Sequence, residues 1–201
     1  MKHFLTLEHY SEKQILDFIA LAEHIKKNPG KYNQKLQGKT LLMLFAKPSL
    51  RTHLSFDVAI SKLGGHAIYY HLDNSSLGKK ESTKDGAKVM SRYVDIIMAR
   101  LYEHKDMLEL AQWCTVPLIN GLDDLFHPCQ VLGDLLTMKE KFGKLKGLHL
   151  TYVGDANNNV THDLLYGCAK LGIHITISCP NTKEFLPNKT IFTLAKKFAG
   201  K

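Results

Sequence analysis

The sequence of 201 residues lacks any apolar run that approaches the roughly 18 residues of a membrane-spanning helix. Its first residues, Met1-Lys2-His3-Phe4, lead into a mixed polar and apolar segment without the apolar core of a signal peptide. Internal repeats and low-complexity tracts are also absent from the sequence. We therefore expect a cytoplasmic protein that has no contact with a membrane.

Cysteine is sparse and scattered. The four cysteines form no C-x-x-C pair, and no clustered histidines accompany them; they are Cys114, Cys129, Cys168 and Cys179. This pattern argues against a disulfide framework or a zinc site and favours buried or neutral thiols.

The formal net charge of +8 is not concentrated in any basic helix or aromatic-basic ribbon. Lysine pairs such as Lys26-Lys27 and Lys196-Lys197 lie far apart in the sequence, as is typical of a solvated surface. A phosphorylated metabolite needs only two or three well-placed cations, so the surplus alone does not select a partner. In the absence of a basic motif we predict no nucleic-acid partner.

Short β-rich segments alternate with helical patterns in the first two thirds of the chain. The run Thr40–Phe45 is apolar except at its first residue, as expected for a strand that is covered on both faces. Alternation of strands and helices predicts an α/β fold with a mainly parallel sheet. The further strands are expected at 67–70, 94–99 and 116–119, and the helices at 51–63, 84–92 and 104–113.

A helix buried along one face is predicted over residues 128–142, where small and apolar side chains recur at helical spacing. After Gly147 the alternation resumes, with strands expected at 148–153 and 173–178 and helices at 160–171 and about 189–199. We expect the first domain to span residues 1–140 and the second 141–201. Two strands and two helices are few for an independent α/β core.

The segment Lys47-Pro48-Ser49-Leu50-Arg51-Thr52 follows the first strand and opens the first long helix. The first backbone N–H groups of a helix lack internal partners, and the helix dipole makes this end positive, so it can hold phosphate. Two hydroxyl groups and the planar guanidinium of Arg51 add further donors. The alternative is that Ser49 only caps the helix and Arg51 is a surface residue.

Arg100 ends the third predicted strand, and ligands of open α/β sheets collect at the carboxyl ends of strands. His127-Pro128-Cys129-Gln130 begins the buried helix, where proline suits the first position. The imidazole can donate to a carbonyl oxygen that gains negative charge, and an amide can recognise a neighbouring NH₂ group. Taken singly, Arg100 could be a surface arginine and His127 a helix-capping or structural histidine.

The loop Gly154–Val160 follows the fifth strand and contains three consecutive asparagines. These amides could contact a polar ligand, although asparagine is also common in plain turns. The G-x-G-x-x-G pattern of a dinucleotide-binding loop is absent here.

In this order, the segments resemble the transcarbamoylase family, and its ornithine branch in particular. The motifs that carry the resemblance are K-P-S-x-R-T at 47–52, L-S-F-D-V-A at 54–59, Lys80-Glu81-Ser82, D-L-F-H-P-C-Q at 124–130 and G-D-A-N-N-N-V at 154–160. The asparagine pair before Val160 is what favours ornithine over aspartate. The resemblance implies a parallel-sheet domain that binds carbamoyl phosphate and an incomplete, Rossmann-like domain that binds the amino acid.

The resemblance also implies roles for individual residues. Those for carbamoyl phosphate are Ser49, the backbone of Leu50, Arg51, Thr52, Arg100, His127 and Gln130. Thr52, Arg100 and His127 would act on the oxyanion, Gln130 would orient the carbamoyl NH₂, and Asn159 would contact ornithine. The products would be citrulline and phosphate, in arginine metabolism. No cofactor or metal is implied, and the family forms homotrimers with active sites at subunit interfaces.

Three departures from the family pattern leave alternatives open. Ser76 stands where the family lends a glutamine to a neighbouring subunit, and Gly86 replaces a threonine at a cost of roughly 1 kcal/mol in a helix interior. The later S-M-G and H-C-L-P motifs have no counterpart before Lys201, so the amine half of the site would be incomplete. The alternatives are a non-catalytic paralogue that retains carbamoyl-phosphate binding, or a transcarbamoylase for another amine such as putrescine or aspartate.

Overall fold

The computed structural model describes residues 3–74 and 81–200 and divides the chain into two compact units. The first unit comprises Met1–Leu5 and Ile25–Asp124, and the second comprises Thr6–His24 and Leu125–Lys201. Ser76 and Lys80 lie outside the described residues. Each unit is an α/β structure with a parallel sheet, which confirms the predicted fold class.

The first unit is built on a four-stranded parallel sheet with the strand order β2-β1-β3-β4. These strands are β1 (Thr40–Phe45), β2 (His66–His71), β3 (Ile96–Arg100) and β4 (Leu118–Leu122). Its helices are α2 (Leu50–Lys62), α3 (Thr83–Tyr93) and α4 (His104–Trp113), with short 3-10 turns at Pro29–Lys31 and Leu72–Asn74. The predicted strand at 116–119 is shifted toward the C-terminus in β4.

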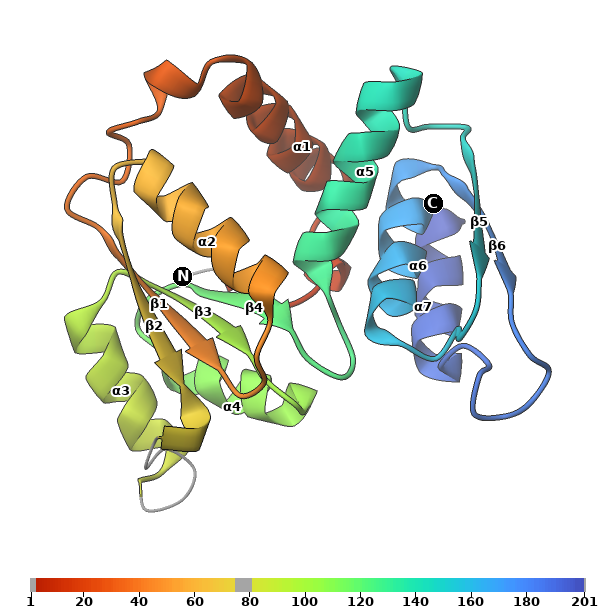
Figure 1. The fold of residues 1–201 in the computed structure, drawn as a ribbon. Coiled ribbons are helices and arrows are strands. Elements are labelled where there is room, and N and C mark those ends of the chain that lie inside the picture. The colour runs from red at the N-terminus through yellow and green to blue at the C-terminus, as the bar shows by residue number, and fades with distance from the viewer. Residues whose placement is uncertain (1–2, 75–80, 201) are drawn as a thin grey trace. The chain divides into compact units, whose positions relative to one another are not determined.

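Both faces of this sheet are covered, because side chains alternate along each strand. From β1, Leu42 and Leu44 join one apolar cluster with residues of α3 and α4. The neighbouring Met43 and Phe45 point to the other face and pack with Ile60 of α2. Figure 1 shows α2 on one side of the sheet and α3 and α4 on the other.

The second unit contains a two-stranded parallel sheet of β5 (His149–Val153) and β6 (His174–Ser178). Its helices are α5 (Pro128–Phe142), α6 (Asn159–Leu171) and α7 (Lys189–Ala199), together with η1 (Leu7–His9) and most of α1 (Glu12–Lys27). α6 is the central element: nine of its residues are buried, and it contacts α5, α7 and η1.

The two units differ from the predicted domains in the placement of α5. Contacts between backbone positions place α5 in the second unit, where it packs on α6. The domain boundary at residue 140 remains a prediction. In the described part of the chain, no helix is long and apolar enough to cross a bilayer.

Candidate functional site

The start of α2 has the geometry of a capped helix N-terminus. Ser49 is the N-cap residue in extended conformation, and its Oγ accepts a hydrogen bond from Thr52 N at 3.4 Å. The same hydroxyl donates to Thr52 Oγ1 at 3.0 Å. Arg51 is exposed beside it, and so is Leu50. Ser49 therefore does cap the helix, as the alternative interpretation stated. This cap occupies only the N–H group of Thr52, so the other N–H groups of the first turn are available to an anion.

Strand pairing brings Arg100 to the same place. Arg100 is the partner of Phe45 across β3 and β1, and its carbonyl accepts a hydrogen bond from Ala46 N at 2.8 Å. From this position Nη1 of Arg100 donates to Thr52 Oγ1 at 3.4 Å. Arg100 Nε is buried and has no hydrogen-bond partner among the described residues. A buried guanidinium N–H without a partner is costly, so this edge holds an unmet donor.

Cations crowd one another at this edge of the sheet. Burial and, secondarily, the guanidinium of Arg51 lower the pKa of Arg100. Burial and then Arg100 lower the pKa of Lys47, while Asp124 and Asp123 partly oppose this. A group of positive charges that repel one another favours the binding of an anion.

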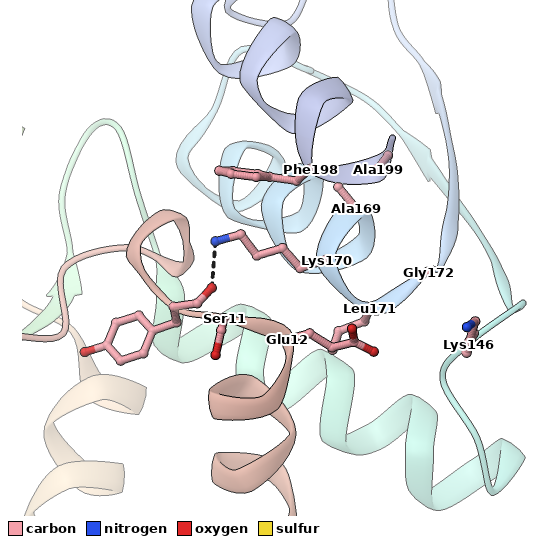
Figure 2. A pocket seen from close by; sticks show the side chains of 10 residues that line it. Ser11, Glu12, Lys146, Ala169, Lys170, Leu171, Gly172, Phe198 and Ala199 are labelled. Carbon is pink, nitrogen blue, oxygen red and sulfur yellow. Dashed lines mark hydrogen bonds between the residues drawn. The ribbon is translucent and has the colours of Figure 1, made fainter. Parts of the chain in front are cut away.

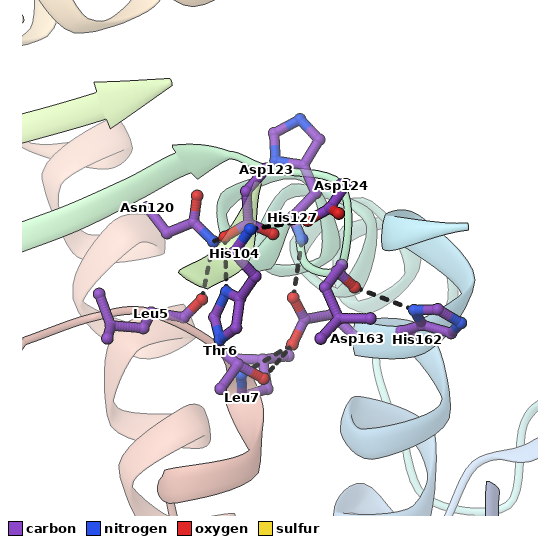
Figure 3. A network of polar contacts seen from close by, with 11 residues as sticks. Leu5, Thr6, Leu7, His104, Asn120, Asp123, Asp124, His127, His162 and Asp163 are labelled. Atoms are coloured by element: carbon purple, nitrogen blue, oxygen red, sulfur yellow. Dashed lines mark hydrogen bonds and ion pairs between the residues drawn. The ribbon is translucent and has the colours of Figure 1, made fainter. Parts of the chain in front are cut away.

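Two carboxylates that act on Lys47 follow β4 directly in the chain. Asp123 has no exposed surface; its Oδ2 accepts a hydrogen bond from Asn120 Nδ2 at 2.8 Å and lies 2.7 Å from His104 Nδ1. Asp124 accepts a hydrogen bond from His104 N at 2.8 Å. Figure 3 shows this network, which holds Asp123 and Asp124 in place directly after β4.

His127 opens α5 in the second unit. It is the N-cap residue, with Pro128 at the first helical position as predicted, but its side chain makes no capping hydrogen bond. Its backbone N–H donates to Asp163 Oδ2 at 2.9 Å. Gln130 is exposed, and its Nε2 donates to Asp134 Oδ1 one turn later at 3.0 Å. The helix-capping alternative for the His127 side chain is therefore wrong.

The asparagine loop has a divided role. Asn158 is the N-cap residue of α6, and its Oδ1 accepts hydrogen bonds from the N–H groups of Val160 and Thr161. Asn159, the residue predicted to contact ornithine, is the first residue of α6 and is half-buried. The turn interpretation therefore holds for Asn158, and Asn159 stays the candidate for ligand contact.

A hollow of about 550 Å³ in the second unit lies away from these residues. Its lining includes Lys146 and Lys170 but none of the predicted site residues (Figure 2). Lys170 Nζ donates to the carbonyls of Leu7, Glu8 and Tyr10 and lies 4.2 Å from the Phe198 ring centroid. Lys170 therefore joins η1 to α6 and α7. Within residues 3–74 and 81–200, no group of three or more His, Cys, Asp and Glu side chains could hold a metal.

The structure thus groups the predicted residues in two sets. Ser49, Leu50, Arg51, Thr52 and Arg100 meet at the carboxyl edge of the first sheet, whereas His127, Gln130 and Asn159 belong to the second unit. The sequence alone did not lead us to assign a role to Lys47 or to Asp163. Lys47 is part of the K-P-S-x-R-T motif and could have been included among the candidate site residues. Asp163 gives no signal in the sequence except that it is a charged residue in an apolar helix.

The chain thus combines a four-stranded parallel α/β unit, in which the start of α2 lies beside Arg100, with a second α/β unit. Residues 2–140 match the family model "Aspartate/ornithine carbamoyltransferase, carbamoyl-P binding domain". Residues 146–201 match the model of the Asp/Orn binding domain of the same family. The chain belongs to the aspartate/ornithine carbamoyltransferase family.

Within this family the chain is similar to ornithine carbamoyltransferases. It is 49% identical over 180 residues to that of Shewanella oneidensis, covering 90% of this chain and 60% of the relative. It is 46% identical over 195 residues to that of Methanocaldococcus jannaschii, covering 97% and 63%. The solved Pyrococcus furiosus enzyme superimposes with a TM-score of 0.94 at 43% identity, covering 99% of this chain and 63% of that one. The chain therefore spans about 60% of the length of these relatives.

Proposed function

We propose that the start of α2 and Arg100 bind the phosphate group of carbamoyl phosphate. The observation that carries this proposal is the buried Arg100 Nε, which has no hydrogen-bond partner among the described residues, whereas Nη1 of the same guanidinium bonds to Thr52. A phosphate oxygen would satisfy this donor and relieve the repulsion between Arg100 and Arg51. The family membership and the helix start support the same ligand.

The reaction we propose is transfer of the carbamoyl group to the side-chain amine of ornithine, which gives citrulline and phosphate. Thr52, Arg100 and His127 stabilise the oxyanion that forms when the amine attacks the carbamoyl carbon. Gln130 orients the carbamoyl NH₂, and Asn159 contacts the amino-acid end of ornithine. Catalysis then consists of orientation and electrostatic stabilisation. The names of the similar enzymes support ornithine as the amine.

The homotrimer and the cytoplasmic location belong to the same proposal. On α2, Leu50, Leu54 and Val58 follow one another at four-residue spacing and are exposed by 75%, 52% and 46%. Such an apolar stripe suits a contact with another copy of the chain. None of the four cysteines, all of which lie in the described part of the chain, forms a disulfide, which suits a reducing compartment. Sedimentation equilibrium of the purified chain measures the oligomeric state.

The binding proposal is tested by titration calorimetry of the chain with carbamoyl phosphate. We expect Arg51→Ala to abolish measurable binding, because the guanidinium is one of the few cations that the anion meets. Arg92→Ala is the matched control: Arg92 is exposed in the last turn of α3 and its loss changes the net charge equally. Equal affinities of the unmodified chain and Arg51→Ala would refute the pocket.

The reaction is tested by citrulline formation from carbamoyl phosphate and ornithine, with putrescine and aspartate as competing amines. Citrulline as the main product supports ornithine, and carbamoylation of another amine identifies a different transcarbamoylase. Binding without any turnover identifies these 201 residues as a carbamoyl-phosphate-binding chain that does not complete the reaction by itself.

A further inference from the structure

Asp163 is a carboxylate with no exposed surface, in the second turn of α6. Its Oδ1 accepts hydrogen bonds from Thr6 Oγ1 at 2.9 Å and from Leu7 N at 2.8 Å. Its Oδ2 accepts one from His127 N at 2.9 Å, as the dashed lines of Figure 3 show. A buried carboxylate is tolerated only when donors surround it, and two of these donors are backbone groups that cannot turn away. The carboxylate therefore fixes the positions of both backbone segments.

The residue before Asp163 holds the same segment from a second point. His162 is buried, and its Nδ1 lies 2.9 Å from the carbonyl oxygen of Leu125. Two consecutive residues of α6 thus bond to residues 125 and 127, on either side of Phe126. Phe126 is itself buried, with its ring 6.4 Å from that of His162. The segment that leads into α5 is therefore held at three successive positions.

The bond from the His127 backbone to Asp163 also matters for the imidazole of His127. The direction of a side chain with two rotatable bonds depends first on the orientation of its backbone. α6 also carries Asn159, exactly four residues before Asp163 and therefore one helical turn away. One turn of α6 thus carries both Asn159, the candidate for contact with the amine, and Asp163, which holds the backbone of His127.

We propose that Asp163 is a positioning residue, which fixes the backbone of His127 and so aims its imidazole relative to the start of α6. This role rests on the proposed function, in which His127 stabilises the oxyanion. Asp163 acts through His127 and touches neither substrate.

The substitution Asp163→Asn tests the charge and the acceptor pattern of this side chain with little change in its shape. An amide offers one oxygen, which keeps two of the three bonds when it faces Thr6 Oγ1 and Leu7 N. Its NH₂ group then faces His127 N, where two donors oppose each other. Thr6→Val is the matched control, because it removes the Thr6 hydroxyl donor from Asp163 and leaves the bond to His127 intact. Thr6 Oγ1 also accepts a hydrogen bond from Glu8 N, so this control weakens η1 as well.

The first measurement is amide hydrogen exchange of His127 by NMR in the chain without ligand. In the unmodified chain we expect exchange about as slow as that of Leu7, whose N–H bonds to the same carboxylate. Asp163→Asn should accelerate exchange at His127 by roughly tenfold, the equivalent of one lost hydrogen bond to a charged group, and Thr6→Val should change it by less than about twofold. Rapid exchange at His127 in the unmodified chain would overturn the proposal even if Asp163→Asn does not fold.

The second measurement separates positioning from a purely structural role. We expect a single sharp set of imidazole signals for His127 in the unmodified chain and in Thr6→Val, and several or broadened sets in Asp163→Asn. The imidazole of His104, in the other unit, is the internal reference. If Asp163→Asn leaves the His127 imidazole signals unchanged, Asp163 is structural only and the proposal fails.

The third measurement adds carbamoyl phosphate to both proteins. In the unmodified chain its binding should shift the His127 imidazole signals, and in Asp163→Asn the affinity should persist while the shift is reduced. Absence of binding to the unmodified chain would refute the proposed function, whereas the exchange and imidazole data in the free chain still decide the role of Asp163. An identical shift in both proteins would count against positioning.

Discussion

Arg100 Nη1 donates a hydrogen bond to Thr52 Oγ1 at 3.4 Å, although 48 residues separate the two in sequence. The contact follows from the parallel pairing of β1 and β3, which sets Arg100 opposite Phe45 and beside the loop that leads into α2. The planar guanidinium can therefore serve Thr52 and a phosphate oxygen at the same time.

Substitution of Arg100 by lysine tests the planar fork without changing the charge. We expect Arg100→Lys to weaken carbamoyl-phosphate binding by at least about tenfold, because an ammonium group is a point charge that cannot form two parallel bonds. Calorimetry measures the affinity, and Arg92→Lys in α3 is the control. An affinity within about twofold of the unmodified chain would show that only the charge of Arg100 matters.

The two capping serines of the first unit allow stability to be separated from binding. Ser49 Oγ and Ser82 Oγ each accept a hydrogen bond from the backbone N–H three residues later, at 3.4 and 3.1 Å. Replacement of either by alanine should lower the free energy of unfolding by about 1 kcal/mol. Urea denaturation measures this loss. Only Ser49→Ala should also weaken carbamoyl-phosphate binding, and equal weakening by Ser82→Ala would contradict a direct role for Ser49.

Much of the fold was predictable because buried strands and amphipathic helices have clear periodicity. The apolar run Thr40–Phe45 became β1 with the predicted bounds, and the predicted buried helix at 128–142 became α5. The helix α1 was missed. Only Ile15 and Ile19 of its sixteen residues are buried, so its apolar stripe is too narrow to stand out from the polar residues around it.

β4 shows why local pattern also misplaced a strand. The prediction stopped at residue 119, because Asn120 and Gly121 are unfavourable in strands. In the structure Asn120 is buried and donates to the carbonyl of Leu5 and to Asp123. A Cβ at Gly121 would lie 2.5 Å from Met98 Sδ on the neighbouring strand. Both residues fit the strand through tertiary contacts, which no local pattern contains.

The candidate site divides in the same way. The helix start at 49–52 was predictable from its position after a strand, since the donors are local. The contact of Arg100 with Thr52 depends on strand register, and the bond of Asp163 to His127 depends on helix packing across 36 residues. Such contacts require the fold.

A pH-dependent contribution to stability is expected from Asp95, which anchors the start of β1. Its carboxylate accepts hydrogen bonds from Lys39 Nζ at 2.7 Å and Thr40 N at 2.9 Å. The bond from Lys39, and then that from Thr40, lower the pKa of Asp95, and desolvation partly opposes them. Because the folded-state pKa is the lower one, this stabilisation is complete above the unfolded value of about 3.9 and is lost as the pH falls through the folded value.

Urea unfolding of the unmodified chain and Asp95→Asn at several pH values tests this sign. The stability difference between the two should be largest near neutral pH and should shrink as the pH falls below about 4. Lys39→Met, which keeps the bond from Thr40 N, should show a smaller pH-dependent loss. A difference that stays constant or grows toward acid pH would contradict the lowered pKa.

Two glycines of the first unit separate backbone strain from steric overlap. Gly38 and Gly64 both have positive φ, at 72° and 89°, where a side chain is disfavoured by about 1–2 kcal/mol. A Cβ at Gly38 would meet nothing within 4 Å, but at Gly64 it would lie 2.5 Å from the backbone oxygen of Asn33. We therefore expect Gly64→Ala to destabilise the first unit more than Gly38→Ala does, because a backbone carbonyl cannot move aside as a flexible side chain can. Urea unfolding of both variants, monitored by circular dichroism, measures the difference in the free energy of unfolding. Equal losses of stability in the two variants would show that the loop around Asn33 moves without cost.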